Sequence, residues 1–187
     1  MKIFYKILLI IILAIFCKEV FILIQHKELY TQPTEFNSIL YLDFKFNEQE
    51  IKMISNAALD WQEATHGKVK FTIINLPTKR EVDLQKGILI LKVDSIDPEI
   101  IALDITSGRP SILGFCKNYG MIPYIKLVPT RMTMNNYQVV VEHELGHLVG
   151  LEHTDEPDTL MYPIIDMGAD KITETDIENF CKKYDCH

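Results

Sequence analysis

Three histidines lie within eleven residues of one short stretch, VVVEHELGHLVGLEHTDEPDTLMYP at 139–163. They are His143, His147 and His153, and Glu144 directly follows the first of them. The chain has six histidines in all, so half of them gather here beside a carboxylate. Neutral imidazoles are common metal ligands and carboxylates are common general bases. This stretch is therefore where the sequence predicts chemistry.

The spacing of the first two histidines suits one face of a helix. Residues four apart lie one above the other on a helix, so His143 and His147 can reach one cation at the zinc–nitrogen distance of about 2.0–2.1 Å. Gly150 follows three residues later, and glycine readily adopts the left-handed conformation that ends a helix. A sharp turn at this glycine would bring His153 back to the same cation as a third ligand.

Three protein ligands with a fourth position left for water are typical of a catalytic zinc site. Glu144 stands next to the first ligand, so its carboxylate points beside the ion, where it can act as the general base. The residues alone leave two alternatives open: a solvated helix with coincidental histidines, and a zinc site that is only structural. A chance match to the whole HExxHxxGxxH pattern is expected on the order of 1 in 10⁵, and no fourth protein ligand is evident.

The flanking sequence predicts the elements that must position these residues. Strands are predicted at 38–46, 68–74, 87–93, 111–116 and 122–128, and helices at 47–67, from 135 or 136 to about 149, and at 172–185. Asn47 and Thr173 are the expected helix caps. Residues 94–110 contain turn residues and are predicted to be a long connection. The expected fold is α+β: a twisted mixed five-stranded sheet, two long helices packed on it and a C-terminal helix.

Composition favours an ordinary globular domain. The 187 residues are enough for a sizeable core, with 48% apolar and 24% charged residues. The net charge is −7, so the chain has no excess of positive charge to neutralise phosphates, and nucleic acid is not an expected partner. Nothing in the sequence indicates an oligomeric state.

The first 25 residues differ from the rest of the chain. Two lysines precede ten unbroken apolar residues at 7–16, and a second apolar run follows a Lys-Glu pair. An uncleaved signal anchor and a cleaved export signal both fit this pattern, and a buried core helix is a third alternative. The first two predict a membrane-anchored or secreted protein whose remainder lies outside the cytoplasm. The expected order is this segment at 1–25, a linker at 26–37 and one domain at 38–187.

The four cysteines leave a disulfide open. Cys17 lies in the hydrophobic segment, and outside the cytoplasm two of the other three, Cys116, Cys181 and Cys186, can pair. The spacing does not choose the pair, and free buried thiols are the alternative. Since no Cys-x-x-Cys pair is present, a thiolate zinc site is not indicated.

The stretch HELGHLVGLEH at 143–153 resembles the metzincin clan of zinc endopeptidases, whose motif is HExxHxxGxxH. The clan also has a methionine turn below the metal, and TLMYP at 159–163 offers Met161 at that place. The helix ITETDIENFCKKYD resembles the last catalytic-domain helix of the matrixins. The matching residues are Asp176, Ile177 and Tyr184, together with Thr154 after the third histidine. The resemblance covers about 36–185.

This resemblance implies a matrixin-like catalytic domain that hydrolyses internal bonds of peptide or protein substrates. The ligands of one catalytic zinc ion would be His143, His147 and His153. Glu144 would be the general base that later passes its proton to the leaving amine. Met161 would be a hydrophobic floor under the ion, with ordinary core packing as the alternative.

Three departures limit what the resemblance implies. The linker at 26–37 contains no cysteine, so latency through a propeptide cysteine is not expected. The stretch 94–113 contains no histidine, so a second zinc ion is not expected either. The same stretch offers possible calcium ligands, although a solvated loop is the alternative; they are Asp94, Asp97 and Asp104. Ile165 stands where many matrixins have a tyrosine on the specificity-pocket wall, so pocket preferences are not carried over.

Two other functions stay open. One is a non-catalytic, membrane-tethered binding module that keeps a zincin scaffold; the presence of Glu144 argues against it. The other is a zinc exopeptidase or amidohydrolase. In the metzincin clan an extended substrate pairs with an edge strand of the sheet, and 111–116, with Gly114 allowing close approach, is the candidate edge.

Overall fold

The computed structural model describes residues 34–76, 87–108, 111–118 and 123–186. Its strands are β1 (Phe36–Leu42), β2 (Val69–Asn75), β3 (Gly87–Lys92), β4 (Gly114–Lys117) and β5 (Tyr124–Leu127). Its helices are α2 (Glu48–Ala64), α3 (Pro98–Ser107), α4 (Tyr137–Leu148) and α5 (Glu174–Lys183). The predicted anchor or signal segment at 1–25 lies outside the described residues. Among the residues that are described, no helix is long and apolar enough to cross a membrane.

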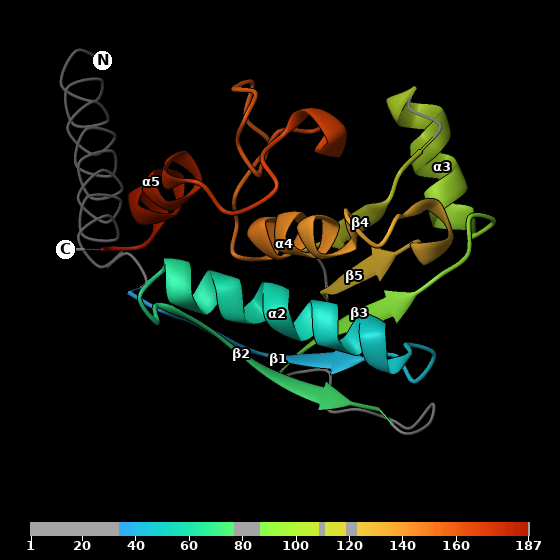
Figure 1. The fold of residues 1–187 in the computed structure, drawn as a ribbon, viewed down its shortest axis with the longest axis horizontal. Helices are drawn as coiled ribbons and strands as arrows, with labels where there is room; N and C mark the ends of the chain where they lie inside the picture. The colour runs from blue at the N-terminus through green and yellow to red at the C-terminus, as the bar shows by residue number, and fades with distance from the viewer. Residues whose placement is uncertain (1–33, 77–86, 109–110, 119–122, 187) are drawn as a thin grey trace, which may run out of the picture. The chain divides into compact units, whose positions relative to one another are not determined.

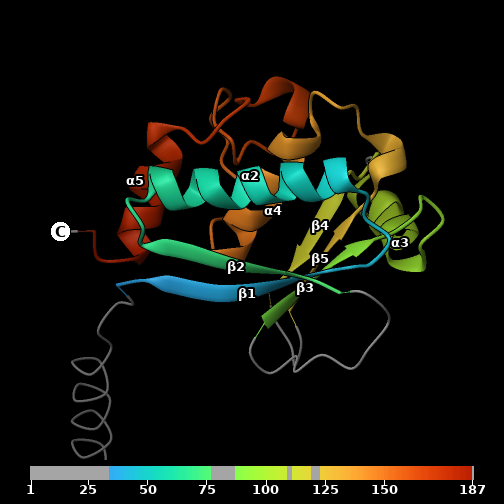
Figure 2. The ribbon, with the colours of Figure 1, turned by 60° about the horizontal axis from the view of Figure 1, so that its bottom comes forward.

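The five strands form one mixed sheet in the order β2-β1-β3-β5-β4. The first four of these are parallel, and β4 runs antiparallel to β5 at one edge. Helices α2 and α4 contact each other and lie on the same face of the sheet (Figure 1 and Figure 2). The predicted α+β class and the mixed five-stranded sheet are confirmed.

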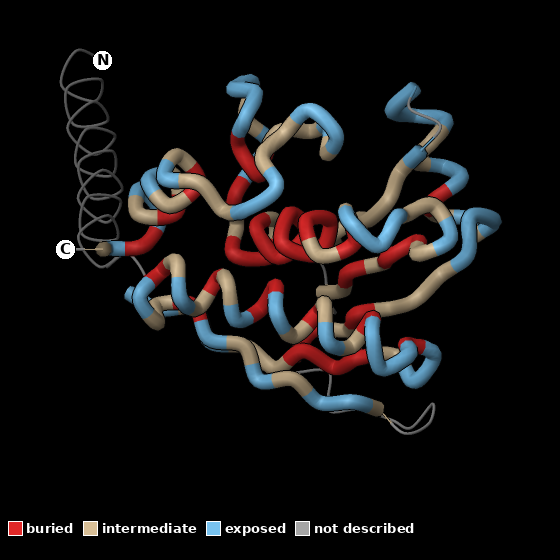
Figure 3. The backbone as a smooth tube through the Cα atoms, in the orientation of Figure 1, coloured by how far each residue is buried: buried red, intermediate tan, exposed pale blue. Residues whose placement is uncertain are grey.

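Helix α2 begins at a capping box. It contacts α4, the helix that carries His143 and His147, through Trp61. The Asn47 side chain accepts from the backbone N–H of Glu50, and the Glu50 carboxylate accepts from the Asn47 N–H, at 2.9 and 2.8 Å. Trp61 is fully buried, and its Nε1 donates to the Glu142 carbonyl of α4 at 2.8 Å. Figure 3 shows that α4 is buried along most of its length, so the core fixes its position.

Helix α3 corrects the prediction of a long connection at 94–110. The Asp97 side chain caps it by accepting from two backbone N–H groups, Pro98 is at its first turn, and Gly108 ends it with a φ of +66°. The apolar pattern hid this helix, because Ile101 and Ile105 are exposed and only Ile100 is buried. A helix with apolar residues on all sides has no amphipathic period to detect.

Several element boundaries and one helix cap also differ from the prediction. β1 ends at Leu42 rather than at residue 46, because Asp43 starts a turn whose carbonyl accepts from the Phe46 N–H at 3.1 Å. Asn136 precedes α4, but its side chain makes no capping bond; it accepts instead from the Thr133 N–H at 2.8 Å.

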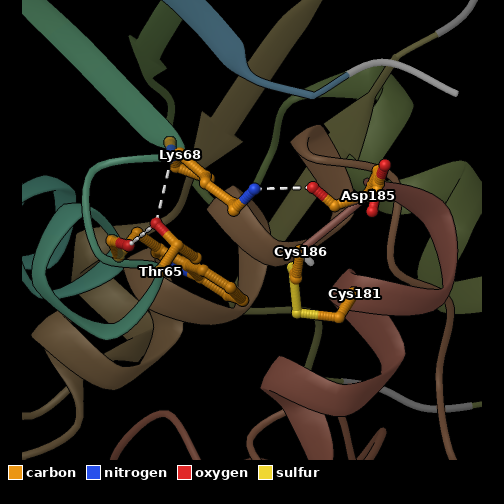
Figure 4. Close-up of a disulfide and its surroundings, with 7 residues drawn as sticks. Thr65, Lys68, Cys181, Asp185 and Cys186 are labelled. Carbon is orange, nitrogen blue, oxygen red and sulfur yellow. Dashed lines mark hydrogen bonds between the residues drawn. A yellow bond between two sulfur atoms is a disulfide. The ribbon is translucent and has the colours of Figure 1, made fainter.

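A disulfide joins Cys181 of α5 to Cys186, while Cys116 is a free thiol (Figure 4). This answers the pairing that the sequence left open. Between the two bonded cysteines, Tyr184 is buried and stacks on Phe180, with ring centroids 4.4 Å apart. The end of α5 also contacts the start of β2, because Lys68 donates to the Asp185 carbonyl at 2.6 Å. The disulfide, the buried Tyr184 and the bond from Lys68 therefore hold the segment after α5 against the rest of the domain.

Candidate metal centre

Helix α4 carries the first two histidines of the motif one turn apart. The ring centroids of His143 and His147 are 4.8 Å apart, and the rings are nearly perpendicular. Buried apolar residues cover the other sides of α4; they are Val139, Val140, Val141, Leu145 and Leu148. The helix therefore presents its two imidazoles together while its remaining side chains anchor it.

A glycine turn returns the chain toward these two rings. Gly150 has a φ of +92°, and its N–H donates to the His147 carbonyl at 3.0 Å. The N–H of Leu151 donates to the Gly146 carbonyl at 2.9 Å, which completes a Schellman motif. The predicted left-handed glycine is confirmed. His153 follows the turn, and its Nε2 lies 3.2 Å from the Nε2 of each helical histidine.

Two backbone carbonyls orient the helical imidazoles. His143 Nδ1 lies 2.7 Å from the Leu160 carbonyl, and His147 Nδ1 lies 2.9 Å from the Leu151 carbonyl. A carbonyl oxygen only accepts hydrogen bonds, so both Nδ1 atoms must carry the proton. Both Nε2 atoms therefore present lone pairs, as in histidines that bind metals.

The chemistry of the three nitrogens fits a zinc ion. A tetrahedral site with zinc–nitrogen distances of about 2.0–2.1 Å has ligand atoms about 3.3–3.4 Å apart, close to the two 3.2 Å separations at His153. The lone pairs of His143 Nε2 and His147 Nε2 both point at His153 Nε2. A proton on His153 Nε2 could be donated to only one of them. A single cation between the rings would bind all three nitrogens. Within the described ranges, these three side chains form the group of possible metal ligands close enough to share an ion.

Electrostatics favour the neutral, metal-binding form of both helical histidines. Burial lowers the pKa of His143 to about 3, helped by the neighbouring His147 and His153 and opposed by the bond to the Leu160 carbonyl. Burial also lowers the pKa of His147. Both rings are therefore neutral at pH 7 and need not lose a proton to bind a cation.

Glu144 lies against the edge strand β4. Its carboxylate is buried and accepts a hydrogen bond from the backbone N–H of Cys116. Burial raises the pKa of Glu144 to about 8, and the Cys116 bond opposes the rise. Within the described part of the chain, Glu144 Oε2 has no hydrogen-bond partner. A buried oxygen without a hydrogen-bond partner costs free energy unless water or a substrate group donates a hydrogen bond to it.

Met161 packs beneath α4, and α5 holds the turn that carries it. Met161 is 1% exposed, and its sulfur is the first atom that a Cβ on Gly146 would meet, so the glycine lets the methionine pack directly under the helix. The buried carboxylate of Asp176 accepts from the N–H groups of Leu160 and Met161 at 3.0 and 3.2 Å. Asp176 thereby fixes the peptide whose Leu160 carbonyl orients His143.

Two carboxylates that the sequence offered for calcium have internal partners. Asp97 accepts from Lys126 at 2.8 and 3.0 Å, and Asp104 accepts from Arg131 at 2.8 and 3.1 Å. Arg131 also donates to the Ile112 carbonyl at 3.0 Å. These contacts join α3 and the segment after it to β5 and the turn that follows.

The structure brings the three predicted ligands together and places the Glu144 side chain against the edge strand β4. Sequence reasoning missed the backbone groups that orient them, namely the carbonyls of Leu151 and Leu160 and the N–H of Cys116. Every residue carries such groups, so no residue type signals them. Asp176 was expected only as part of a helix cap and a family match, and its distance of fifteen residues from Met161 carries no local signal.

Comparisons with known proteins agree with this geometry. The family model described as Matrixin matches residues 36–185. Archaemetzincin from Methanopyrus kandleri is similar in structure, with a TM-score of 0.55 and 14% identity over 83% of this chain and 98% of that chain. Metalloproteinase-II from Bacteroides fragilis aligns with a TM-score of 0.48 and 17% identity over 82% of this chain and 54% of that chain. At 14% identity the likeness to archaemetzincin concerns the fold alone. No curated protein gives a significant match.

Proposed function

Because the chain belongs to the matrixin family of zinc metallopeptidases, we propose that it is a zinc-dependent endopeptidase that cleaves internal bonds of peptide or protein substrates. The observation that carries the proposal is the approach of His153 Nε2 to within 3.2 Å of two other Nε2 atoms, both of which present lone pairs. Three converging imidazoles with no carboxylate or thiolate among them are a ligand set typical of catalytic zinc.

His143, His147 and His153 would hold the ion. When bound there, zinc supplies Lewis-acid chemistry: it lowers the pKa of water toward about 7 and polarises a carbonyl. The positive charge of bound zinc would favour the ionised form of Glu144 and so oppose the rise in pKa that burial causes. The ionised Glu144 accepts the proton of the attacking water and then passes it to the leaving amine. Its Oε2, which has no partner among the described residues, is the oxygen available for that proton.

The position of β4 supports cleavage within a chain rather than at its end. β4 is the last strand on its side of the sheet, so its outer backbone groups, apart from the Cys116 N–H that donates to Glu144, can pair with an extended peptide. A peptide that pairs along an open edge is free to extend past the strand in both directions, as cleavage of an internal bond requires. Glu144 lies against this same strand, bonded to the Cys116 N–H, so the general base is next to where such a peptide would lie.

We also propose that the domain works outside the cytoplasm. The disulfide between Cys181 and Cys186 supports this location, because disulfides persist in oxidising compartments. The hydrophobic segment predicted at 1–25 would deliver the domain there and either anchor or release it. Protease added to intact cells that produce the full chain should degrade an anchored domain; protection until the membrane is permeabilised would contradict the location.

The activity is tested with internally quenched peptides and metal analysis, on the full chain and on Glu144→Ala. We expect one zinc ion per chain in both proteins, and internal cleavage that falls about 10²–10⁴-fold in the variant. Zinc binding without turnover in the wild type would favour the non-catalytic binding module. Release of single terminal residues without internal cleavage would favour an exopeptidase.

A further inference from the structure

Gly114, the first residue of β4, touches the side chain of Glu144. A Cβ built on Gly114 would lie 2.7 Å from Glu144 Oε1, 2.8 Å from its Cγ and 3.0 Å from its Cδ. These are the three nearest atoms, and all belong to one side chain. Favourable non-bonded carbon contacts are about 3.5–4.0 Å, so even a methyl group fits here only if the carboxylate moves.

The carboxylate of Glu144 has little freedom to move. It is buried and is held by the N–H of Cys116, two residues along the same strand as Gly114. The strand is also held in place: it pairs along its length with β5, and Asn118 directly after it donates to the His147 carbonyl of α4 at 3.0 Å. Contacts at Cys116 and at Asn118 therefore fix the spacing between β4 and α4. The Glu144 carboxylate fits into this space because Gly114 has no side chain.

Glycine in a short strand needs a reason. It weakens a strand because it packs no side chain and loses more conformational entropy on folding. A close approach of another group is one of the few roles that offset this cost. Here the approaching group is the carboxylate of Glu144, and the glycine lies in the edge strand itself.

We propose that Gly114 is a positioning residue for the reaction: its missing side chain lets the Glu144 carboxylate lie flat on the edge strand, next to a paired substrate. This inference rests on the proposed function, in which Glu144 is the general base. We expect a methyl group at position 114 to shift the carboxylate away from the strand, because the three atoms nearest to it all belong to Glu144 and none to a histidine. A misplacement of about 1 Å in a reacting group can lower a rate by ~10²-fold.

The contact is tested first by thermal unfolding of the metal-free full chain, which does not depend on activity. Gly114→Ala should lower Tm by about 3–8 °C when Glu144 is present, because the added methyl overpacks a buried site. In the Glu144→Ala background the same change should leave Tm within about 1 °C or raise it slightly, since alanine reduces the entropy of the unfolded chain. An equal loss of Tm in both backgrounds would overturn the contact.

The positioning role is tested by kinetics of the zinc-loaded enzyme. In Gly114→Ala we expect kcat to fall about 10–100-fold, with KM and zinc content within about twofold of the wild type. In a Glu144→Asp background the same change should cost less than about threefold, because aspartate is one methylene shorter and leaves room for the methyl. Gly108→Ala is the matched control: Gly108 has a φ of +66° and nothing within 4 Å of an added Cβ, so it should lower Tm without lowering kcat.

The outcomes separate the two proposals. Normal kcat in Gly114→Ala, or a loss that appears in KM or zinc content instead, would overturn the positioning role and leave the proposed function intact. Absence of Glu144-dependent hydrolysis in the wild type would overturn the proposed function and the positioning role together, while the unfolding cycle would still report on the contact.

Discussion

At the scale of single residues, the proposed metal centre depends on groups that would not touch the ion. His143 presents Nε2 because the Leu160 carbonyl fixes the proton on Nδ1. Leu160 in turn is held by Asp176 through its N–H. A chain of three hydrogen-bonded groups thus runs from α5 to His143, the first proposed ligand, and outer partners of this kind strongly influence metal affinity.

Asp176→Ala should weaken both zinc binding and the fold. It removes the acceptor of two buried N–H groups, those of Leu160 and Met161, so we expect a loss of about 2–4 kcal/mol in the free energy of unfolding. We also expect zinc affinity to fall about 10–100-fold. Urea unfolding and competition with a zinc chelator measure the two effects. Asp176→Asn keeps one acceptor oxygen and should lose less of both; equal losses would argue against the hydrogen-bond explanation.

At the scale of elements, the ion pairs of Lys126 help to hold α3 against the sheet. Lys126 of β5 contacts both Asp97 and Glu99, at 2.8 and 3.0 Å. Burial by itself raises the pKa of each carboxyl. For Asp97, bonds from Lys126 and the α3 backbone more than offset it, and for Glu99 those from Tyr124 and Lys126 do, so both pKa values lie below their usual range. The ionised carboxylates therefore stabilise the folded chain.

The pH dependence of stability should reveal this cluster. A carboxyl whose pKa is lower in the folded than in the unfolded chain adds stability above the unfolded pKa of about 4. That stability is lost as pH falls through the folded pKa. We expect the urea midpoint of the wild type to fall more steeply below about pH 4 than that of Lys126→Met. Parallel curves for the two proteins would show that Lys126 does not stabilise the ionised forms of Asp97 and Glu99.

The disulfide at the end of α5 should contribute to stability in a way that reduction removes. The bond between Cys181 and Cys186 spans a sequence separation of 5, for which loop entropy predicts about 2 kcal/mol. Cys181→Ser with Cys186→Ser should therefore unfold at lower denaturant than the wild type under oxidising conditions and at the same denaturant in excess reductant. Cys116→Ser, at the free thiol, is the control and should respond to reductant as the wild type does. A difference that persists after reduction would show that the serines themselves destabilise α5.

At the scale of the whole molecule, the domain should not need zinc to fold. Its core contains many side chains with almost no exposed surface, including Trp61, Leu145 and Phe180. The turn at Gly150 and the orientation of both helical imidazoles rest on protein hydrogen bonds. Zinc would therefore complete a site that the fold has already built, unlike the small domains that are unfolded without metal.

Removal of zinc should abolish hydrolysis and keep the fold. After treatment with a chelator we expect the far-UV circular dichroism to be retained and Tm to fall, because a ligand bound only to the native state stabilises it by mass action. Added zinc should restore both activity and Tm. Cooperative loss of the circular dichroism signal on chelation would show that the ion is required for folding.

The candidate site and most elements could be predicted because their signals are local. The spacing of His143 and His147, the turn at Gly150 and the capping boxes at Asn47 and Thr173 all act within one or two helical turns. Residue type and short spacing decide such features before any tertiary contact forms. The order of strands and helices that supports the site follows from the same kind of pattern.

Only the tertiary structure showed which contacts connect these local elements. The fit of Glu144 onto Gly114, the bond of Asp176 to the Met161 turn and the ion pairs of α3 link segments far apart in the chain. Many of them use backbone groups, which every residue carries, or the absence of a side chain, which no motif records. Which ones meet depends on how the sheet and helices pack, so the sequence by itself determined the chemistry of the site, and the packing determined its geometry.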